Sequence, residues 1–131
     1  MKTAEKQDKK AYFAGLRARW QSVKNELTQG QIDEITCVIK LHGLNISPYS
    51  YAFCAMQMRS LGFDGIPYAD CKTYKGWQQF GFQVRKGEHS EIDGITWIAV
   101  GKDSENNDER YMLPKLYHLF HRSQVEPIEV L

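Results

Sequence analysis

Residues 72–88 constrain the fold most strongly, because this short stretch combines a helix start, two large aromatic side chains and a helix stop. Thr73 can cap a helix that begins at the next residue. Trp77 and Phe80 lie three residues apart, so we expect them to share one face of that helix. Gly81 follows at the position where helices commonly end in a left-handed residue. The pattern predicts a short amphipathic helix that ends abruptly.

The residues after this helix predict an extended segment and then a basic turn. Gln83 and Val84 indicate a brief strand. Residues 85–88 read Arg-Lys-Gly-Glu, which is typical of an exposed turn. Gly87 can adopt a positive φ there because it has no Cβ.

The order Tyr-Lys-x-Trp-x-x-x-Gly-x-x-Val-Arg-Lys-Gly-Glu resembles the signature of the N-terminal domain of plasmid and phage ArdC-type antirestriction proteins. The resemblance implies a small α/β domain that binds single-stranded DNA and shields incoming plasmid or phage DNA from host restriction. In longer members a zinc-metalloprotease-like domain often follows. The matching positions are Tyr74, Lys75, Trp77, Gly81, Val84, Arg85, Lys86, Gly87 and Glu88.

Two further stretches resemble the same family. Residues 120–124 are similar to its Phe-Asp-x-Ser-Gln strand end, with His121 where an Asp is usual, and residues 47–58 are similar to the helix before the tryptophan motif. We therefore expect a stand-alone ArdC-N-like domain over residues 1–131, with residues 1–8 frayed. The sequence leaves open whether a protease-like partner domain exists on another chain.

Length and charge narrow the ways in which the chain could bind nucleic acid. Its 131 residues fit one domain, and its formal net charge is only +1. A basic footprint over the whole protein is therefore absent. Any DNA binding must rest on local groups of cations.

The cysteines and the N-terminus favour a cytoplasmic protein, which the resemblance places in a bacterial host cell. The chain has three cysteines without CxxC spacing, a pattern that argues against a disulfide framework and a zinc site. We expect Cys37, Cys54 and Cys71 to be buried, reduced thiols. The charged N-terminus lacks the apolar stretch of a secretory signal, and no apolar run is long enough to span a membrane.

No recognisable catalytic motif is present, so we expect neither enzymatic activity nor a cofactor. HExxH, G-x-S-x-G and P-loop sequences are all missing. His118 and His121 form an HxxH pair, but on a strand their side chains would point to opposite faces. We therefore expect no metal site there.

Apolar periodicity predicts a first helix over residues 8–27, with Asp8 as its cap. Its other faces carry basic residues, which are either a solvated surface or a cationic face for a nucleic-acid backbone; basic surface alone is common, which favours the solvated surface. The apolar stripe consists of Phe13, Leu16, Trp20, Val23 and Leu27.

Two more helices are predicted before the tryptophan motif. Residues 28–30 look like a break, and residues 31–42 fit helical spacing but also have the β-branched richness of a strand; their length and the stop at Gly43 favour a helix. Ser47 and Pro48 are a strong helix start, and Gly62 a stop. The expected buried stripe of this helix is Tyr51, Cys54, Ala55, Met58 and Leu61.

The C-terminal third predicts a long β-hairpin. Residues 95–100 are nearly all apolar, which suits a central strand. Residues 111–121 form the second strand, in which Pro114 implies an edge or a bulge. Residues 125–131 can add a short extended piece. The predicted fold is therefore α+β: three helices and a short motif helix packed on a small antiparallel sheet.

Cations near aromatic side chains indicate where single-stranded DNA could bind, because such binding needs charges for phosphates and ring faces for bases. We expect Tyr74 to stack on a base, whereas Trp77 is either a stacking platform or, more often for such a tryptophan, a core anchor. If Tyr117 points outward, alternation puts Lys115 and His121 beside it and turns Leu116, His118 and Phe120 inward. The full candidate set is Lys72, Tyr74, Lys75, Trp77, Gln78, Arg85, Lys86, Lys115, Tyr117 and Arg122.

Two functions of different classes follow. The first is non-sequence-specific binding of single-stranded DNA, which protects incoming plasmid or phage DNA from restriction. The alternative is a counter-defence protein that inhibits a host nuclease or CRISPR effector by direct protein–protein binding. In that case the acidic loop of residues 101–109 would mimic nucleic acid.

Overall fold

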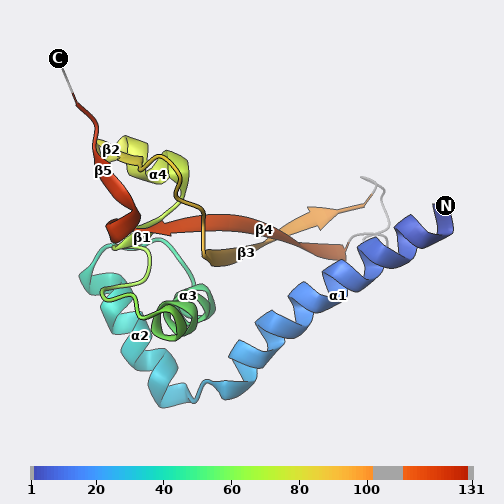
Figure 1. The fold of residues 1–131 in the computed structure, drawn as a ribbon. Coiled ribbons are helices and arrows are strands. Elements are labelled where there is room, and N and C mark those ends of the chain that lie inside the picture. The colour runs from blue at the N-terminus through green and yellow to red at the C-terminus, as the bar shows by residue number, and fades with distance from the viewer. Residues whose placement is uncertain (1, 102–110, 130–131) are drawn as a thin grey trace.

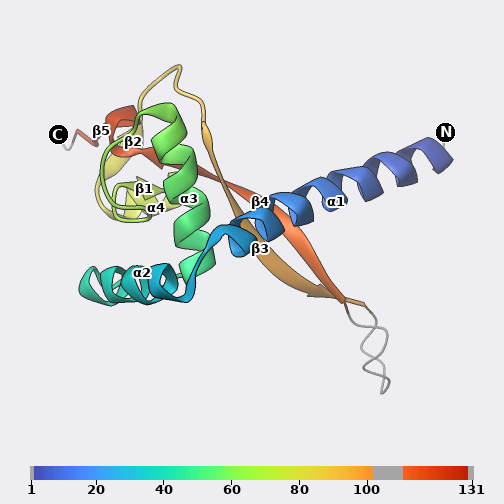
Figure 2. The ribbon, with the colours of Figure 1, turned by 90° about the horizontal axis from the view of Figure 1, so that it is seen from below.

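The computed structural model describes residues 2–101 and 111–129, and it has the predicted α+β architecture (Figure 1). Figures 1 and 2 place the N-terminus and the α4, β2 and β5 segments at opposite ends of the molecule. In chain order the elements are α1 (Lys2–Glu26), α2 (Gln29–Leu41), α3 (Pro48–Leu61), β1 (Cys71–Lys72), α4 (Tyr74–Gln79), β2 (Phe82–Val84), β3 (Ile92–Val100), β4 (Tyr111–His121), a 3-10 helix (Arg122–Gln124) and β5 (Val125–Pro127).

The first helix carries the predicted apolar stripe but starts earlier than predicted. Helical backbone begins at Lys2, so the prediction that Asp8 caps the helix is wrong. No cap is needed at Asp8, since Lys- and Ala-containing sequence before it also favours helix. The stripe is confirmed: Leu16 and Val23 are buried, and half-buried beside them lie Phe13, Trp20 and Leu27.

The ambiguous second segment is a helix, and its cap lies in the predicted break. Thr28 Oγ1 accepts a hydrogen bond from the backbone N–H of Gln31, whose side chain in turn accepts from the Thr28 N–H. This reciprocal capping satisfies donors that a helix start leaves unpaired. Residues 29–30, which were expected to belong to the break between helices, are therefore the first residues of α2.

The third helix has the predicted ends and most of the predicted stripe. Ser47 Oγ accepts a hydrogen bond from the backbone N–H of Ser50, and Gly62 ends the helix with φ +74°. Cys54 and Met58 are buried, but Leu61 is exposed, so that part of the prediction is wrong. Residues of α3 contact two cores, and Ala52 and Phe53 are also buried.

The sheet has the order β1-β4-β3, which makes β4 the central strand. The predicted hairpin is confirmed, with pairing from Ile92–Leu119 to Val100–Tyr111. However, β3 lies at an edge, so the prediction that residues 95–100 form a central strand is wrong. Within residues 95–100, Ile95 is buried, whereas Ile98 is exposed. The edge expected at Pro114 is confirmed, because β1 pairs only with the far end of β4.

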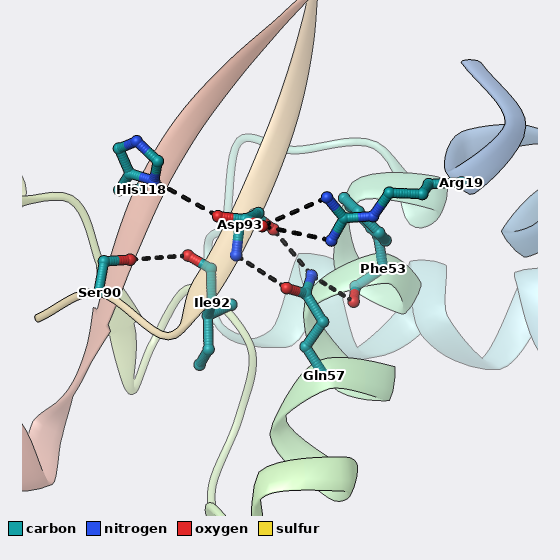
Figure 3. A network of polar contacts seen from close by, with 7 residues as sticks. All are labelled: Arg19, Phe53, Gln57, Ser90, Ile92, Asp93 and His118. Carbon is teal, nitrogen blue, oxygen red and sulfur yellow. Dashed lines mark hydrogen bonds and ion pairs between the residues drawn. The ribbon is translucent and has the colours of Figure 1, made fainter. Parts of the chain in front are cut away.

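A side chain of α3 pairs with the outer edge of β3 at Asp93 (Figure 3). Gln57 Nε2 donates to the backbone oxygen of Asp93 at 2.8 Å, and Gln57 Oε1 accepts from its N–H at 2.8 Å. The Asp93 carboxylate also lies 3.3 Å from Arg19 Nη1 and 3.4 Å from His118 Nδ1. The network joins α1, α3, β3 and β4. Within it, Gln57 pairs with the backbone N–H and oxygen of Asp93 near the start of this edge strand.

Two core clusters hold the helices on the hairpin. An apolar cluster lies where α1 passes across the hairpin (Figure 2); Trp20 there packs edge-on against Phe53 and Trp97. Its buried members are Leu16, Val23, Ala52, Phe53 and Ile95. A mixed cluster lies between α3, β1 and β4, and its buried members are Cys54, Met58, Cys71, Ile92 and Leu119.

The mixed cluster contains hydrogen bonds among its side chains. The Tyr68 and Tyr117 hydroxyls bond to each other, and burial is the main cause that raises the pKa of both. A hydrogen bond with Cys54, together with burial, raises the pKa of the Cys71 thiol. Burial is confirmed for these two cysteines, which are both unpaired, but Cys37 is exposed, so the prediction of burial is wrong there.

The C-terminal segment pairs with the strand after α4. The predicted extended piece is confirmed as β5, which runs antiparallel to β2 with Val84 opposite Val125. Beyond it, the Ile128 N–H donates to the backbone oxygen of Gly81 at 2.9 Å. This small ribbon ties the end of the described chain to α4.

His121 caps the 3-10 helix that follows β4. Its Nδ1 accepts from the Ser123 N–H at 3.2 Å and so caps the 3-10 helix, the bond that an Asp carboxylate would also accept. Its Nε2 donates to the Asp64 backbone oxygen at 2.6 Å, and its ring stacks on Phe63 at 4.4 Å between centroids. The imidazole ring is larger than a carboxylate, so it adds packing contacts at this buried position.

Candidate nucleic-acid interface

Helix α4 has the predicted start and stop but divides its aromatic residues. Thr73 Oγ1 accepts from the Gly76 N–H at 3.0 Å, and Gly81 follows the helix with φ +84°. Trp77 is buried and its Nε1 donates to the Phe120 backbone oxygen at 2.8 Å, so it is the core anchor. Phe80 is 65% exposed, but it shares a face with Trp77 as predicted, because Lys72 Nζ lies over both rings.

A concavity of ≈ 770 Å³ lies between the start of α4, residues 88–90 and the end of β4; we call it the Tyr74 concavity. Tyr74 is 50% exposed and stands edge-on to Phe120, with 6.4 Å between ring centroids and 70° between ring planes. The side chains that line it include Lys75, Glu88, His89 and His118. It therefore combines an accessible aromatic ring with a cation, as single-strand binding requires.

Long-range hydrogen bonds hold the wall formed by residues 88–90. Ser90 Oγ lies 2.8 Å from the backbone oxygen of Leu119. Gln124 Nε2 donates to the backbone oxygen of His89 at 2.8 Å and to Glu88 Oε2 at 3.2 Å. The wall is thus fixed to β4 and to the 3-10 helix.

Tyr117 lines the Tyr74 concavity but is not an open stacking platform. Its ring lies over Gly94, where an added Cβ would fall 2.1 Å from Cε2, and its hydroxyl bonds to Tyr68. Tyr117 and His121 turn inward while His118 is exposed, so the outward arrangement of Tyr117 is wrong. The mixed cluster decides this orientation, because Tyr117 packs against it.

Lys72 and Arg122 lie on another side of α4, in a second concavity of ≈ 630 Å³ that we call the Phe80 concavity. Lys72 Nζ lies 4.4 Å from the Phe80 ring centroid and donates to the Tyr68 backbone oxygen at 3.0 Å. Burial lowers the pKa of Lys72. Arg122 Nη1 lies 3.1 Å from Asp70 Oδ1. Both cations therefore already have partners in the protein.

The other predicted site residues are exposed but line neither concavity. Arg85 and Lys86 lie on the predicted turn, which a hydrogen bond of 3.1 Å from the Glu88 N–H to the Arg85 oxygen closes and in which Gly87 has φ +89°. Gln78 is exposed on α4, and Lys115 is exposed on β4. The structure thus brings Tyr74, Lys75 and Tyr117 together and separates them from Lys72, Trp77 and Arg122.

Sequence reasoning missed Phe120, His89 and Phe80 as site residues, and the arrangement with Tyr117 outward turned His118 inward. Alternation along β4 could have found His118 and Phe120, had the buried set been recognised as Tyr117, Leu119 and His121. No local pattern places His89, because its position depends on the hydrogen bond from Gln124. Phe80 was expected to share a face with Trp77, and its exposure was not predicted.

Three further predictions concern the HxxH pair, a membrane span and the acidic loop. His118 and His121 lie on opposite faces as predicted, and residues 2–101 and 111–129 contain no group of three His, Cys, Asp or Glu side chains placed to hold a metal ion. Within the same ranges, no helix is both long and apolar enough to cross a membrane. The acidic loop of residues 101–109 lies, apart from Gly101, outside the described residues, and the inhibitor alternative that rests on it stays a prediction.

Comparison with models of protein families, with curated protein sequences and with solved structures yields no match. The resemblance to ArdC-type domains therefore stays a prediction that rests on the quoted residues alone. The function has to be argued from the geometry.

Proposed function

We propose that the protein binds single-stranded DNA, without sequence preference, at the face formed by α4, residues 85–90 and the end of β4. The observation that carries the proposal is Tyr74, a half-exposed ring at the mouth of a concavity that also contains Lys75. Every base offers a π-face, so stacking on Tyr74 would not select a sequence. Protection of incoming DNA from restriction is the role that the family resemblance adds to this proposal.

The charges around the Tyr74 concavity favour one orientation of the strand. Glu88 lines the concavity, and its carboxylate would repel a phosphate there. Bases would therefore enter the concavity, while the phosphates pass the exposed cations Lys75, Arg85 and Lys86. Three such contacts correspond to a salt slope of about −2.1 for single-stranded DNA, or a loss of roughly 20-fold in affinity between 50 and 200 mM salt.

The same geometry favours single strands over duplexes. A base within a duplex has both faces covered by its neighbours, so its ring cannot stack on Tyr74 without being unstacked at a cost of a few kcal/mol. The phosphates of a duplex remain available to the three cations. Duplex binding should therefore be weaker and should depend on charge alone.

The experiment is fluorescence anisotropy with a labelled oligo-dT of about 30 nucleotides and a duplex of equal length, each at 50 and 200 mM salt. We expect salt-sensitive binding that prefers the single strand and that Tyr74→Ala weakens about tenfold. Tyr111→Ala is the matched control, because Tyr111 is similarly exposed at the opposite end of β4. Equal affinity for both DNA forms, or equal losses in the two variants, would contradict the proposal.

A further inference from the structure

The end of α4 presents a second exposed aromatic ring that neither the fold nor the Tyr74 concavity uses. Phe80 is 65% exposed, although Trp77 one turn earlier already anchors α4 to β4. Phe80 lines the Phe80 concavity together with Lys72 and Arg122. The Phe80 concavity therefore combines an exposed aromatic ring with positive charge, as the Tyr74 concavity does.

Lys72 orients the Phe80 ring and adds charge to it. The ammonium lies over the ring at 4.4 Å, a cation–π distance, and is held there by its hydrogen bond to the Tyr68 backbone oxygen. One ring face is thus covered by a cation, and the high exposure of Phe80 leaves the rest of the ring accessible. An ammonium has three N–H donors, so the bond to Tyr68 leaves donors of Lys72 for a phosphate.

Arg122 can also serve a second partner. Its contact with Asp70 uses one of the five N–H donors of the guanidinium, and the Arg122 side chain is half-exposed. A phosphate bound beside this pair would share Arg122 with Asp70. Asp70 lowers the net positive charge here, so stacking on Phe80 must contribute more of the affinity than the charges do.

We propose that Phe80 stacks on a second base of the same DNA strand, with Lys72 and Arg122 at the neighbouring phosphates. This inference rests on the proposed function and deepens it by giving the strand a path: from Tyr74 across α4 to Phe80. The two rings flank a single short helix that Trp77 fixes to β4, so their separation is set by the fold.

The path predicts a minimum length of DNA. Six residues of helix separate the two rings by about 9 Å along the axis, and the strand must also pass round part of a cylinder about 10 Å wide. At roughly 3.4 Å per nucleotide, a strand needs about four nucleotides or more to reach both rings. A shorter strand occupies one ring at a time.

The test measures the affinity of oligo-dT of about three and about ten nucleotides for wild type, Tyr74→Ala, Phe80→Ala and Phe80→Trp. With the longer DNA, we expect Phe80→Ala to lose about tenfold in affinity and Phe80→Trp to bind as wild type, since indole also stacks. With the shorter DNA, Phe80→Ala should lose no more than about twofold, because Tyr74 remains available. Circular dichroism checks that each variant is folded.

The outcomes separate the second site from the first. If Phe80→Ala binds the longer DNA as tightly as wild type while Tyr74→Ala binds it weakly, the second site is overturned and the proposed function stands. Wild-type protein that binds neither length would overturn both. Phe80→Leu provides a further check, because leucine has no π-face. If Phe80→Ala loses about tenfold in affinity but Phe80→Leu binds as tightly as wild type, stacking at position 80 is overturned.

Discussion

The two ends of the molecule are held together by different kinds of contact. At the α1 end, Leu16 and Val23 pack with Trp20 against the hairpin in the apolar cluster. At the α4 end, specific hydrogen bonds connect residues far apart in sequence, such as Trp77 to the Phe120 oxygen and Ser90 to the Leu119 oxygen. Both ends carry exposed cations, but the Tyr74 and Phe80 concavities both adjoin α4.

The two kinds of contact differ in how many aromatic rings they leave exposed at the surface. An apolar interface needs its aromatic residues inside, and Trp20 at the α1 end packs against three other aromatic rings. Hydrogen bonds at the α4 end fix the backbone with few buried rings, which leaves Tyr74 and Phe80 exposed. Side chains that break the local rule of burial are expected at functional sites.

Trp77 and Trp20 give the largest expected difference between the ends. Trp77→Phe removes buried volume and the donor to the Phe120 oxygen, so we expect a loss of about 3 kcal/mol in the free energy of unfolding. Trp20→Phe removes volume from a half-buried ring, with an expected loss of about 1–2 kcal/mol. Urea denaturation of both variants measures the difference. Equal losses would show that the hydrogen bond contributes nothing to the α4 end.

Charge reversal compares the cations of the two ends. Arg85→Glu with Lys86→Glu should lower affinity for single-stranded oligo-dT by about 25-fold at 0.1 M salt and reduce the salt slope by about 1.4, because two phosphate contacts are lost. Lys9→Glu with Lys10→Glu changes two exposed residues of α1 and should leave affinity unchanged. Anisotropy titrations at several salt concentrations measure both. A comparable loss in the α1 variant would move the interface to that end.

Removal of the buried cap at His121 should lower the free energy of unfolding more than removal of the exposed cap at Thr28. His121→Ala removes the acceptor for the Ser123 N–H and the donor to the Asp64 oxygen, and we expect a loss of about 2 kcal/mol. Thr28→Ala removes an exposed cap of α2 and should cost about 1 kcal/mol. His121→Asn should recover part of the loss, since Asn is a strong cap. Thermal or urea unfolding that shows no recovery would argue against the capping role of His121.

Alkaline pH gives the smallest expected effect and acts at the mixed cluster. Burial raises the pKa of Tyr68 and Tyr117, so the folded state holds these protons after the unfolded state has lost them. Their stabilisation is present below a pH of about 10 and is lost as the pH rises above it. Lys72, whose pKa burial lowers, acts in the opposite direction. Urea midpoints between pH 9 and 11 should fall less in Tyr68→Phe with Tyr117→Phe; the same fall in both proteins would exclude this origin.

Helices could be predicted because their signals are local. Ser47, Thr73, Gly62 and Gly81 act within four residues of the elements they start or stop, and each has the predicted role. The start of α1 could not be found in this way, because a helix can continue past a suitable cap such as Asp8 when the residues before it also favour helix.

The sheet order and half of the site could not be predicted, because they depend on distant partners. β1 has only two residues and so no periodicity, yet its pairing with His121 and Phe120 makes β4 central. The wall of the Tyr74 concavity is held by Gln124, which is 35 residues from His89. Tyr117 faces inward because it bonds to Tyr68, a contact across 49 residues.

The most direct test of the α4 end as the interface is a heteronuclear NMR titration of the isotope-labelled protein with oligo-dT of about ten nucleotides. We predict that the amide signals of Tyr74, Lys75, Arg85 and Phe120 shift together as DNA is added. Signals from residues 9–17 of α1 should stay in place. Shifts confined to α1, or no shifts at tens of micromolar protein and DNA, would contradict the assignment of the interface.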